Sequence, residues 1–285
     1  MDRGVTAGVA GTVTIGGDLV VNRLGFGAMR LCGPGIWGEP SDPDAARALL
    51  RRVVELGVQL IDTADAYGPE VNEQQIADAL HPYPADLVIA TKGAGTRESA
   101  EHWGIDGRPE HLRQACEASL RRLRLERIDL YQLHGLDPNV PVEESVGALA
   151  RLQAEGKIRH IGVSNVDESE LARAQGVAKI VSVQNPYNVA DRKWESVVDA
   201  CERQGIVFLA YFPLGAGWRA ATPADALRTV AEKHGATPQQ VALAWLLHRS
   251  PVILPIPGTS SPVHLEENVA AAGLVLDGQD LAALG

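Results

Sequence analysis

Polar side chains end several short apolar runs of this sequence. Asp62 ends one run and Tyr67 follows it within the segment IDTADAYG, while Lys92 and His134 end two later runs. These residue types can pass protons and stabilise charge, so acid–base catalysis is one interpretation of the pattern. The alternative is structural, because Asp62 could cap a helix, Lys92 could be a solvated surface lysine and His134 could be a hydrogen-bonded core histidine.

Three further apolar runs also end in polar residues. Ser164 and Asn165 end one of them, Gln184 ends the next, and Tyr211 ends the third. Ser164 and Asn165 could simply cap the helix that begins DESELARA. Separate caps and turns do not explain why polar groups stand at the same end of consecutive runs. This regularity favours one functional site built from several strand ends.

Short runs rich in Val and Ile alternate with helical patterns along the chain, which is typical of repeated strand–helix units. In the first helix, Asp42 can act as the cap, Pro43 fits the first turn, and Gly57 follows the end. Residues 237–240, TPQQ, match a capping box. The eight expected strands are residues 23–29, 58–62, 86–92, 128–134, 158–165, 180–185, 206–211 and 252–258.

Eight such units most simply close into a (β/α)8 TIM barrel, and residues 1–285 are expected to form this one domain. Active sites of such barrels lie where the strands end, which agrees with the position of the polar residues. Residues 11–16 and 18–22 are expected to form an N-terminal β-hairpin that caps the bottom of the barrel.

A doubly wound sheet is the competing architecture. Its dinucleotide site is usually marked by G-x-G-x-x-G after the first strand. Here Gly25 and Gly27 are followed by Arg30 in the third position, so the fingerprint is missing. The length of 285 residues and the 45% hydrophobic content also suit one barrel with a sizeable core.

Seven segments, in order, resemble the aldo-keto reductases, which are NADPH-dependent oxidoreductases built on this barrel. They are LIDTADAYG, VIATKG, IDLYQLH, IRHIGVSN, VQNPYN, LAYFPLG and IPGTSSPVHLEENVAA, and the similarity spans roughly residues 20 to 272. The resemblance implies reduction of an aldehyde or ketone to an alcohol by hydride transfer from NADPH. It also implies a catalytic tetrad of Asp62, Tyr67, Lys92 and His134, with Tyr67 as the proton donor.

Carbonyl reduction gives each member of this tetrad a chemical role. A proton must reach the developing alkoxide, and tyrosine is a poor acid unaided because its ordinary pKa is about 10. The Lys92 ammonium is expected to lower the pKa of Tyr67 below that value, and Asp62 to compensate the desolvation of the lysine. Neutral His134 can orient the substrate carbonyl. Asp65 is assigned only to turn or helix-capping duty.

The resemblance also indicates where the cofactor binds. Ser164, Asn165 and Gln184 match the residues that bind the nicotinamide carboxamide. Tyr211 matches the aromatic residue that stacks on the nicotinamide ring, and Phe212 replaces a serine that is common in the pyrophosphate strap. The other expected cofactor residues are Gly27, Ala28, Met29, Pro213, Leu214, Gly215, Gly258, Thr259, Ser260, Ser261, His264, Glu267 and Asn268.

The segment that would bind the 2′-phosphate departs from the family pattern. Hydroxyls from Thr259 to Ser261 precede a helix opened by Pro262, and such a helix terminus suits an anion. His264 and Gly258, however, stand where the family often has Arg and Lys. A bidentate Arg would discriminate better than hydroxyls, so NADPH is the expected cofactor and NADH is the alternative.

The expected substrate is a small-molecule carbonyl compound. Trp37, Trp103 and Trp218 occur in loops after expected strands and are candidates for the pocket wall, although loop tryptophans also cover apolar surface. The long loop 93–109 is expected to be functional because of its length. Gly135 replaces a bulky residue that is usual in the family, which implies a wider pocket.

Composition narrows the remaining functions. The formal net charge of −10 argues against nucleic-acid and anionic-membrane partners. Cys32, Cys116 and Cys201 form neither a zinc pattern nor a disulfide framework, and the eight histidines contain no H-x-H or H-x-x-x-H pair, so no metal is expected. Without a signal-like start or a long apolar stretch, a cytoplasmic monomer or small homo-oligomer is expected.

Three other functional classes compete with a reductase. A metal-dependent hydrolase lacks clustered ligands, and a glycosidase lacks two carboxylates poised across a pocket, because Glu143, Glu144, Glu266 and Glu267 lie on expected helices. The third class is a regulatory or scaffold protein that binds the nicotinamide cofactor with little turnover. The presence of all four tetrad residues favours an enzyme.

Overall fold

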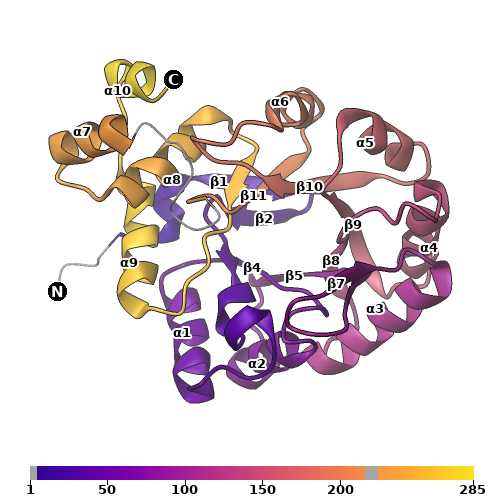
Figure 1. Cartoon of the computed structure of the whole chain (residues 1–285). Helices are drawn as coiled ribbons and strands as arrows, with labels where there is room; N and C mark the ends of the chain where they lie inside the picture. The colour runs from indigo at the N-terminus through magenta and orange to yellow at the C-terminus, as the bar shows by residue number, and fades with distance from the viewer. Residues whose placement is uncertain (1–4, 216–223) are drawn as a thin grey trace.

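Parallel strands form a central barrel that is surrounded by helices (Figure 1). The structure is a computed structural model and describes residues 5–215 and 224–285. Eight strands pair in parallel in the order β12-β11-β10-β9-β8-β5-β4-β3, so the expected (β/α)8 TIM barrel is confirmed. These strands are β3 (Phe26–Gly27), β4 (Leu60–Asp62), β5 (Val88–Gly93), β8 (Ile128–Leu133), β9 (Ile158–Ser164), β10 (Ile180–Pro186), β11 (Val207–Tyr211) and β12 (Ile253–Pro255).

The barrel closes between its first and last strands. The backbone N–H of Gly25 donates to the Pro255 carbonyl at 3.0 Å, and that of Gly27 donates to the Pro257 carbonyl at 3.3 Å. A Cβ on Gly27 would lie 2.8 Å from the carbonyl oxygen of Ile256. The two glycines therefore allow the close backbone approach that joins the ends of the sheet.

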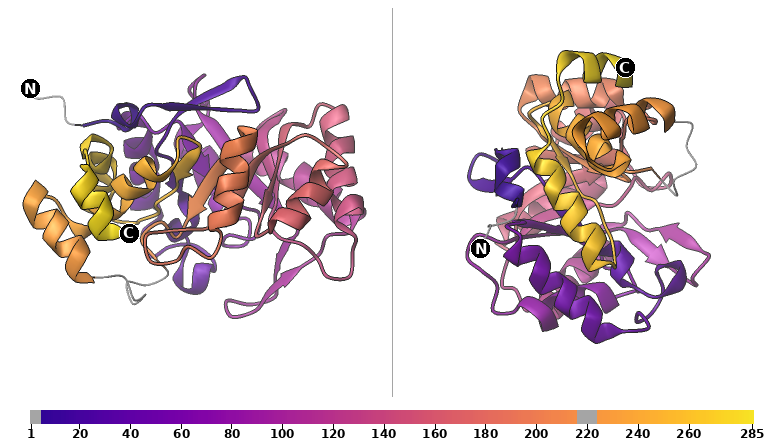
Figure 2. Two further views of the ribbon diagram at one scale, coloured as in Figure 1. Left: turned by 90° about the horizontal axis from the view of Figure 1, so that it is seen from above. Right: turned by 90° about the vertical axis from the view of Figure 1, so that its left-hand side faces the viewer.

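Helices follow the strands and cover the outside of the barrel (Figure 2). Asp42 caps the first of them by accepting a hydrogen bond from the Ala45 N–H, and Thr237 forms a capping box with Gln240, as predicted. The helices are α1 (Pro43–Glu55), α2 (Val71–Leu80), α3 (Pro109–Leu123), α4 (Val142–Ala154), α5 (Glu168–Gln175), α6 (Glu195–Gln204), α7 (Ala224–His234), α8 (Pro238–Arg249), α9 (Pro262–Ala270) and α10 (Gly278–Leu284).

Helix α5 begins at Glu168, which is too far along the chain for Ser164 or Asn165 to cap it. Asp167 caps it and forms a capping box with Glu170. Ser164 is instead the last residue of β9, and Asn165 follows it with a φ of +60°, a conformation that Asn tolerates better than most residues. The interpretation of Ser164 and Asn165 as caps is therefore wrong.

An antiparallel hairpin of β1 (Thr12–Ile15) and β2 (Leu19–Asn22) covers the end of the barrel at which the strands begin. Its side chains Ile15, Leu19 and Val21 belong to one buried cluster with residues of the barrel strands. The barrel residues of this cluster are Leu60, Val88, Ala90, Leu130, Val181, Val207, Leu209 and Leu254. The predicted hairpin cap at the bottom of the barrel is confirmed.

The long segment between β5 and α3 contains a small hairpin of its own. In it, β6 (Gly95–Arg97) pairs antiparallel with β7 (Trp103–Ile105). A Cβ on Gly135 would lie 3.0 Å from Cδ1 of Ile105, so the Ile105 side chain lies next to Gly135. The wider pocket expected from Gly135 stays a prediction. No helix within residues 5–215 and 224–285 is both long and apolar enough to cross a membrane.

The closure of the barrel predicts a cost for any side chain at Gly27. We expect Gly27→Ala to lower the free energy of unfolding by roughly 1–3 kcal/mol, because backbone must move to admit the methyl group. Urea denaturation followed by circular dichroism measures this change. The matched control is Gly278→Ala at the start of α10, where an added Cβ meets no atom within 4 Å. If both variants unfold at the wild-type midpoint, the close approach at Gly27 does not constrain the barrel.

Candidate active site

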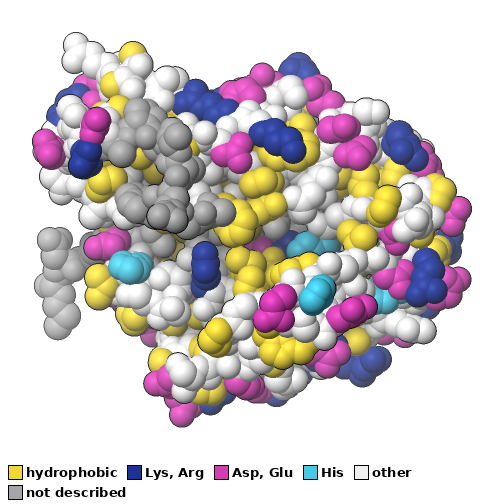
Figure 3. Space-filling model, in the orientation of Figure 1, with side chains coloured by type: hydrophobic (Ala, Val, Ile, Leu, Met, Phe, Trp, Pro, Cys, Tyr) yellow, Lys and Arg dark blue, Asp and Glu magenta, His cyan; other side chains and the backbone are white. Residues whose placement is uncertain are grey.

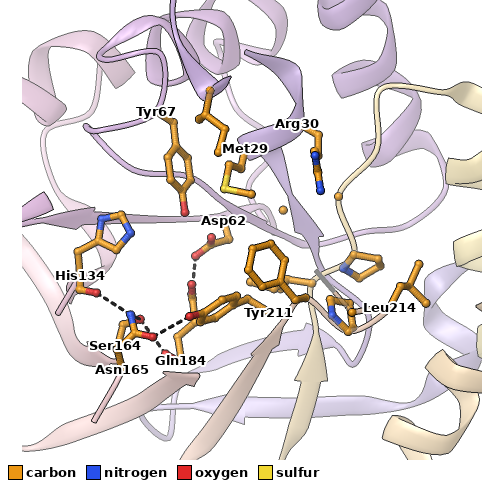
Figure 4. A pocket seen from close by; sticks show the side chains of 18 of the residues that line it. Met29, Arg30, Asp62, Tyr67, His134, Ser164, Asn165, Gln184, Tyr211 and Leu214 are labelled. Atoms are coloured by element: carbon orange, nitrogen blue, oxygen red, sulfur yellow. Dashed lines mark hydrogen bonds between the residues drawn. The ribbon is translucent and has the colours of Figure 1, made fainter. Parts of the chain in front are cut away.

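A pocket of about 350 Å³ opens at the ends of the barrel strands. Figure 4 shows Tyr67, His134 and Asp62 toward one side of it and Arg30 and Leu214 toward the other. Hydrophobic side chains gather in the middle of the face that Figure 1 presents (Figure 3). The pocket is lined by Gly27, Met29, Arg30, Ile36, Asp62, Tyr67, Trp103, His134, Ser164, Asn165, Gln184, Tyr211, Phe212, Pro213, Leu214, Gly215, Ile256, Pro257 and Gly258.

Lys92 is fully buried and does not itself line the pocket. Its ammonium donates to Asp62 Oδ2 at 2.6 Å, to the Thr63 carbonyl at 2.8 Å and to the Tyr67 hydroxyl at 3.4 Å. Asp62 is 3% exposed, so water does not screen the ion pair. The interpretations of Lys92 as a surface lysine and of Asp62 as a helix cap are therefore wrong. Lys92 therefore bridges the Asp62 carboxylate and the Tyr67 hydroxyl.

Burial has the largest effect on the pKa of Tyr67. It raises the pKa above the ordinary value, and the opposing effect of Lys92 does not reverse this, since Asp62 offsets the charge of the lysine. The expectation of a pKa below the ordinary value is wrong. Burial alone would lower the pKa of Lys92, but Asp62 and Tyr67 hold it above its ordinary value. At neutral pH a charged ammonium therefore lies beside a protonated phenol.

His134 lies beside Tyr67, with the two rings edge to face and their centroids 5.7 Å apart. Burial and, to a smaller extent, the charge of Lys92 lower the pKa of His134 to about 3, so the imidazole is neutral. Its Nδ1 is buried and has no hydrogen-bond partner among the residues described. That nitrogen lies 2.7 Å from the position a Cβ on Gly95 would take. His134 is thus not a core histidine satisfied by protein hydrogen bonds.

Gln132 is a buried member of the site that sequence reasoning missed. Its Nε2 donates to Asp62 Oδ1 at 3.2 Å, and Nε2 of Gln184 donates to the same oxygen at 2.7 Å. Gln132 lies on β8 two residues before His134, and alternate residues of a strand face the same side. This two-residue spacing between Gln132 and His134 is the sequence signal that could have identified Gln132.

The predicted nicotinamide-binding residues form one hydrogen-bonded group. The Tyr211 hydroxyl donates to Asn165 Oδ1 at 2.7 Å, and Asn165 Nδ2 donates to the His134 carbonyl at 3.0 Å. The hydroxyl of Ser164 donates to the Gln184 carbonyl at 2.7 Å. Burial raises the pKa of Tyr211 to about 12, so this hydroxyl remains a donor. The group connects the predicted cofactor side of the pocket to His134.

Arg30 is a charged residue of the pocket that sequence reasoning did not assign to the site. It is exposed and lines the pocket, and its Cγ lies 3.6 Å from the position a Cβ on Gly258 would take. Ala28, by contrast, is fully buried and does not line the pocket; its carbonyl accepts from Asn72 Nδ2 at 3.0 Å. Besides Ser164, Asn165, Gln184 and Tyr211, the predicted cofactor residues that line the pocket are Gly27, Met29, Phe212, Pro213, Leu214, Gly215 and Gly258.

The residues predicted to hold the 2′-phosphate and adenine lie beyond the pocket, past Gly258. Ser261 caps α9 by accepting from the His264 N–H at 3.4 Å, and Thr259 Oγ1 accepts from the Ser261 N–H at 3.0 Å. Thr259, Ser260, Ser261, His264, Glu267 and Asn268 are all absent from the pocket lining. They continue from its edge along the start of α9.

The structure bears differently on the three tryptophans predicted to line the pocket. Trp103 lines the pocket, and its ring meets those of Tyr67 and His134 edge to face, each at a centroid distance of 6.3 Å. Trp37 does not line the pocket, so its assignment to the pocket wall is wrong. Trp218 lies outside the described residues.

Asp65 does not cap a helix. The residue at the N-cap of α2 is Glu70, and the Asp65 side chain keeps a buried oxygen, Oδ1, without a hydrogen-bond partner in the described part of the chain. Its backbone carbonyl accepts from the Glu70 N–H at 2.8 Å, which fits the expected turn. Burial, followed by the charge of Glu73, raises the pKa of Asp65 well above its ordinary value.

Comparison with known proteins identifies the family to which this barrel belongs. A profile described as "Aldo/keto reductase family" matches residues 23–285. The chain belongs to the aldo/keto reductase family. It is an oxidoreductase of the NAD(P)H-dependent aldo-keto reductase type, as the seven resembling segments predict.

Relatives of this aldo/keto reductase cover nearly its whole length. It is 45% identical over 276 residues to pyridoxine 4-dehydrogenase of Escherichia coli (strain K12), covering 94% of this chain and 95% of the relative. It is 48% identical over 280 residues to an uncharacterized oxidoreductase of Schizosaccharomyces pombe, covering 98% and 90%. A crystal structure of an aldo-keto reductase from Klebsiella pneumoniae in complex with NADPH gives a TM-score of 0.82 at 30% identity, covering 96% and 93%.

The buried ion pair predicts a large cost for removing one partner. We expect Lys92→Met to lower the free energy of unfolding by roughly 3–5 kcal/mol, because the Asp62 carboxylate stays buried without its cation. Urea denaturation measures the change. The control is Lys193→Met, which removes an exposed ammonium and should leave the midpoint unchanged. The account fails if the two variants are equally stable, or if Asp62→Asn added to Lys92→Met does not recover stability.

Proposed function

We propose that this aldo/keto reductase reduces planar aromatic aldehydes of the pyridoxal class, with NADPH as the hydride donor and Tyr67 as the proton donor. The observation that carries the proposal is the contact between the Tyr67 hydroxyl and the buried Lys92 ammonium in a pocket with aromatic walls. The name of the Escherichia coli relative, pyridoxine 4-dehydrogenase, supports the substrate class.

Tyr67 is suited to give its proton to the developing alkoxide. Because its pKa lies above the ordinary value, the phenol is protonated at neutral pH and available as an acid. NADPH, when bound, supplies the hydride that reaches the carbonyl carbon. As the proton leaves Tyr67, the phenolate forms 3.4 Å from the Lys92 ammonium, which stabilises the new negative charge. The proton moves from the phenol oxygen to the alkoxide oxygen and yields the alcohol.

His134 is suited to orient the carbonyl rather than to transfer a full proton. A pKa of about 3 keeps the ring neutral, so one ring nitrogen carries a proton and the other does not. Nδ1 is buried against Gly95 without a partner in the described structure. We therefore assign Nε2 as the nitrogen that donates to the carbonyl oxygen, which places this oxygen between His134 and Tyr67.

The residues on the other side of the pocket fit a nicotinamide dinucleotide. Asn165 and Gln184 offer amide groups that complement a carboxamide, and Tyr211 offers an aromatic face for the nicotinamide ring. Arg30 offers a guanidinium for the phosphates that NADPH and NADH share. Hydroxyls from Thr259 to Ser261 would then meet the 2′-phosphate, which supports a preference for NADPH.

The proton-donor role predicts a selective loss of turnover. We expect Tyr67→Phe to lower kcat by roughly a hundredfold to ten-thousandfold while the Kd for NADPH stays unchanged, because only the acid is lost. Steady-state NADPH oxidation with pyridoxal and benzaldehyde measures kcat, and fluorescence titration measures Kd. The control is Tyr83→Phe, which removes a hydroxyl bound to the Leu123 carbonyl. NADPH binding by the wild-type protein without turnover of any aldehyde would instead support a regulatory protein.

The position of Arg30 predicts a second effect, on cofactor binding. We expect Arg30→Met to weaken NADPH and NADH about tenfold each, because a charged hydrogen bond to a shared phosphate is lost. Fluorescence titration with both cofactors measures the two Kd values. Arg51→Met, on the exposed side of α1, is the control. A loss for NADPH alone would show that Arg30 binds the 2′-phosphate, and no loss would remove Arg30 from the cofactor site.

A further inference from the structure

The guanidinium of Arg97 joins two loops at the edge of the pocket. On one side it donates to the carbonyls of Ile36 at 3.0 Å and Gly35 at 2.9 Å. On the other side it donates to the carbonyls of Ala100 at 2.9 Å and Ser99 at 3.2 Å. Each of these acceptors is a backbone oxygen. Arg97 therefore orders the backbone of both loops.

Two tryptophan rings contact the same guanidinium. Cζ of Arg97 lies 3.9 Å from the ring centroid of Trp103 and 5.5 Å from that of Trp37. A guanidinium over the face of an aromatic ring is favoured because the ring face is electron-rich. Trp103, whose ring is the nearer of the two to the guanidinium, also meets the rings of Tyr67 and His134 edge to face. The Arg97 guanidinium therefore lies against a ring that belongs to the pocket wall.

The same arrangement reaches the segment that carries the predicted proton donor. The Ile36 carbonyl that accepts from Arg97 also accepts from the Gly68 N–H at 3.3 Å. Gly68 directly follows Tyr67, and Ile36 lines the pocket together with Trp103. Arg97 is therefore connected to both wall residues and, through one shared carbonyl, to the backbone next to Tyr67.

We propose that Arg97 is a positioning residue that determines the acceptance of broad, planar carbonyl compounds by holding Trp103 and Ile36 beside Tyr67. Arg97 does not line the pocket itself, so it acts through these two residues. A two-ring aldehyde is wide enough to lie against Trp103 and Ile36, whereas a three-carbon aldehyde reaches Tyr67 without them. The inference rests on the proposed reduction of planar aldehydes.

The experiment compares 2-naphthaldehyde with propanal in wild-type protein, Arg97→Met and Arg97→Lys. We expect Arg97→Met to raise KM for 2-naphthaldehyde about tenfold, as for the loss of one cation–π contact and the wall position that it supports, with kcat nearly unchanged. For propanal both constants should stay within about twofold of wild type. Arg97→Lys keeps a cation but not the planar fork, so it should restore part of the lost affinity. The matched control is Arg108→Met, an exposed arginine of the same loop that pairs with Asp106.

The outcomes separate this inference from the proposed function. If wild type turns over neither aldehyde, the proposed reduction itself fails. If wild type is active but Arg97→Met changes the two substrates equally, or changes neither, Arg97 does not determine selectivity and the inference is overturned. Thermal unfolding and NADPH titration of Arg97→Met accompany the kinetics. A selective rise in KM with an unchanged Kd for NADPH supports the inference even if the variant is less stable.

Discussion

The ion pair between Lys92 and Asp62 is the interaction on which the rest of the site depends. Each group offsets the cost of burying the other's charge, because burial strongly disfavours an unpaired charge. Together, with Gln132 and Gln184 bound to the second carboxylate oxygen, they keep an ammonium 3.4 Å from the phenol of Tyr67. The pair leaves the phenol protonated at rest and stabilises the phenolate once the proton is gone.

The barrel makes this arrangement possible by bringing together residues that are far apart in the chain. Asp62 and Lys92 lie on the neighbouring strands β4 and β5, and Gln132 lies on β8, which pairs with β5. Loops supply further residues of the pocket wall. Arg97 and Trp103 come from the hairpin between β5 and α3, where the Arg97 guanidinium lies against the Trp103 ring and Trp103 meets the rings of Tyr67 and His134. The strands thus position the predicted tetrad, and this hairpin supplies part of the pocket wall.

Local rules predicted the features that depend on neighbouring residues. The caps Asp42 and Thr237 follow from residue type and spacing, and the strand-end positions of the predicted tetrad follow from the repeat of apolar runs. Sequence reasoning failed where contacts cross the fold. The pocket position predicted for Trp37 is wrong because the sequence does not reveal its contact with Arg97, and the direction of the Tyr67 pKa shift depends on a depth of burial that no local pattern records.

The central claim is that burial keeps Tyr67 protonated and His134 neutral throughout the physiological range. The most direct measurement is kcat/KM for benzaldehyde, an aldehyde that does not titrate, from about pH 5 to about pH 9, with a deuteride isotope effect showing that hydride transfer limits the rate. The account predicts a flat profile, because the pKa of Tyr67 lies above its ordinary value and that of His134 is about 3. A fall in kcat/KM with its midpoint inside this range would contradict it.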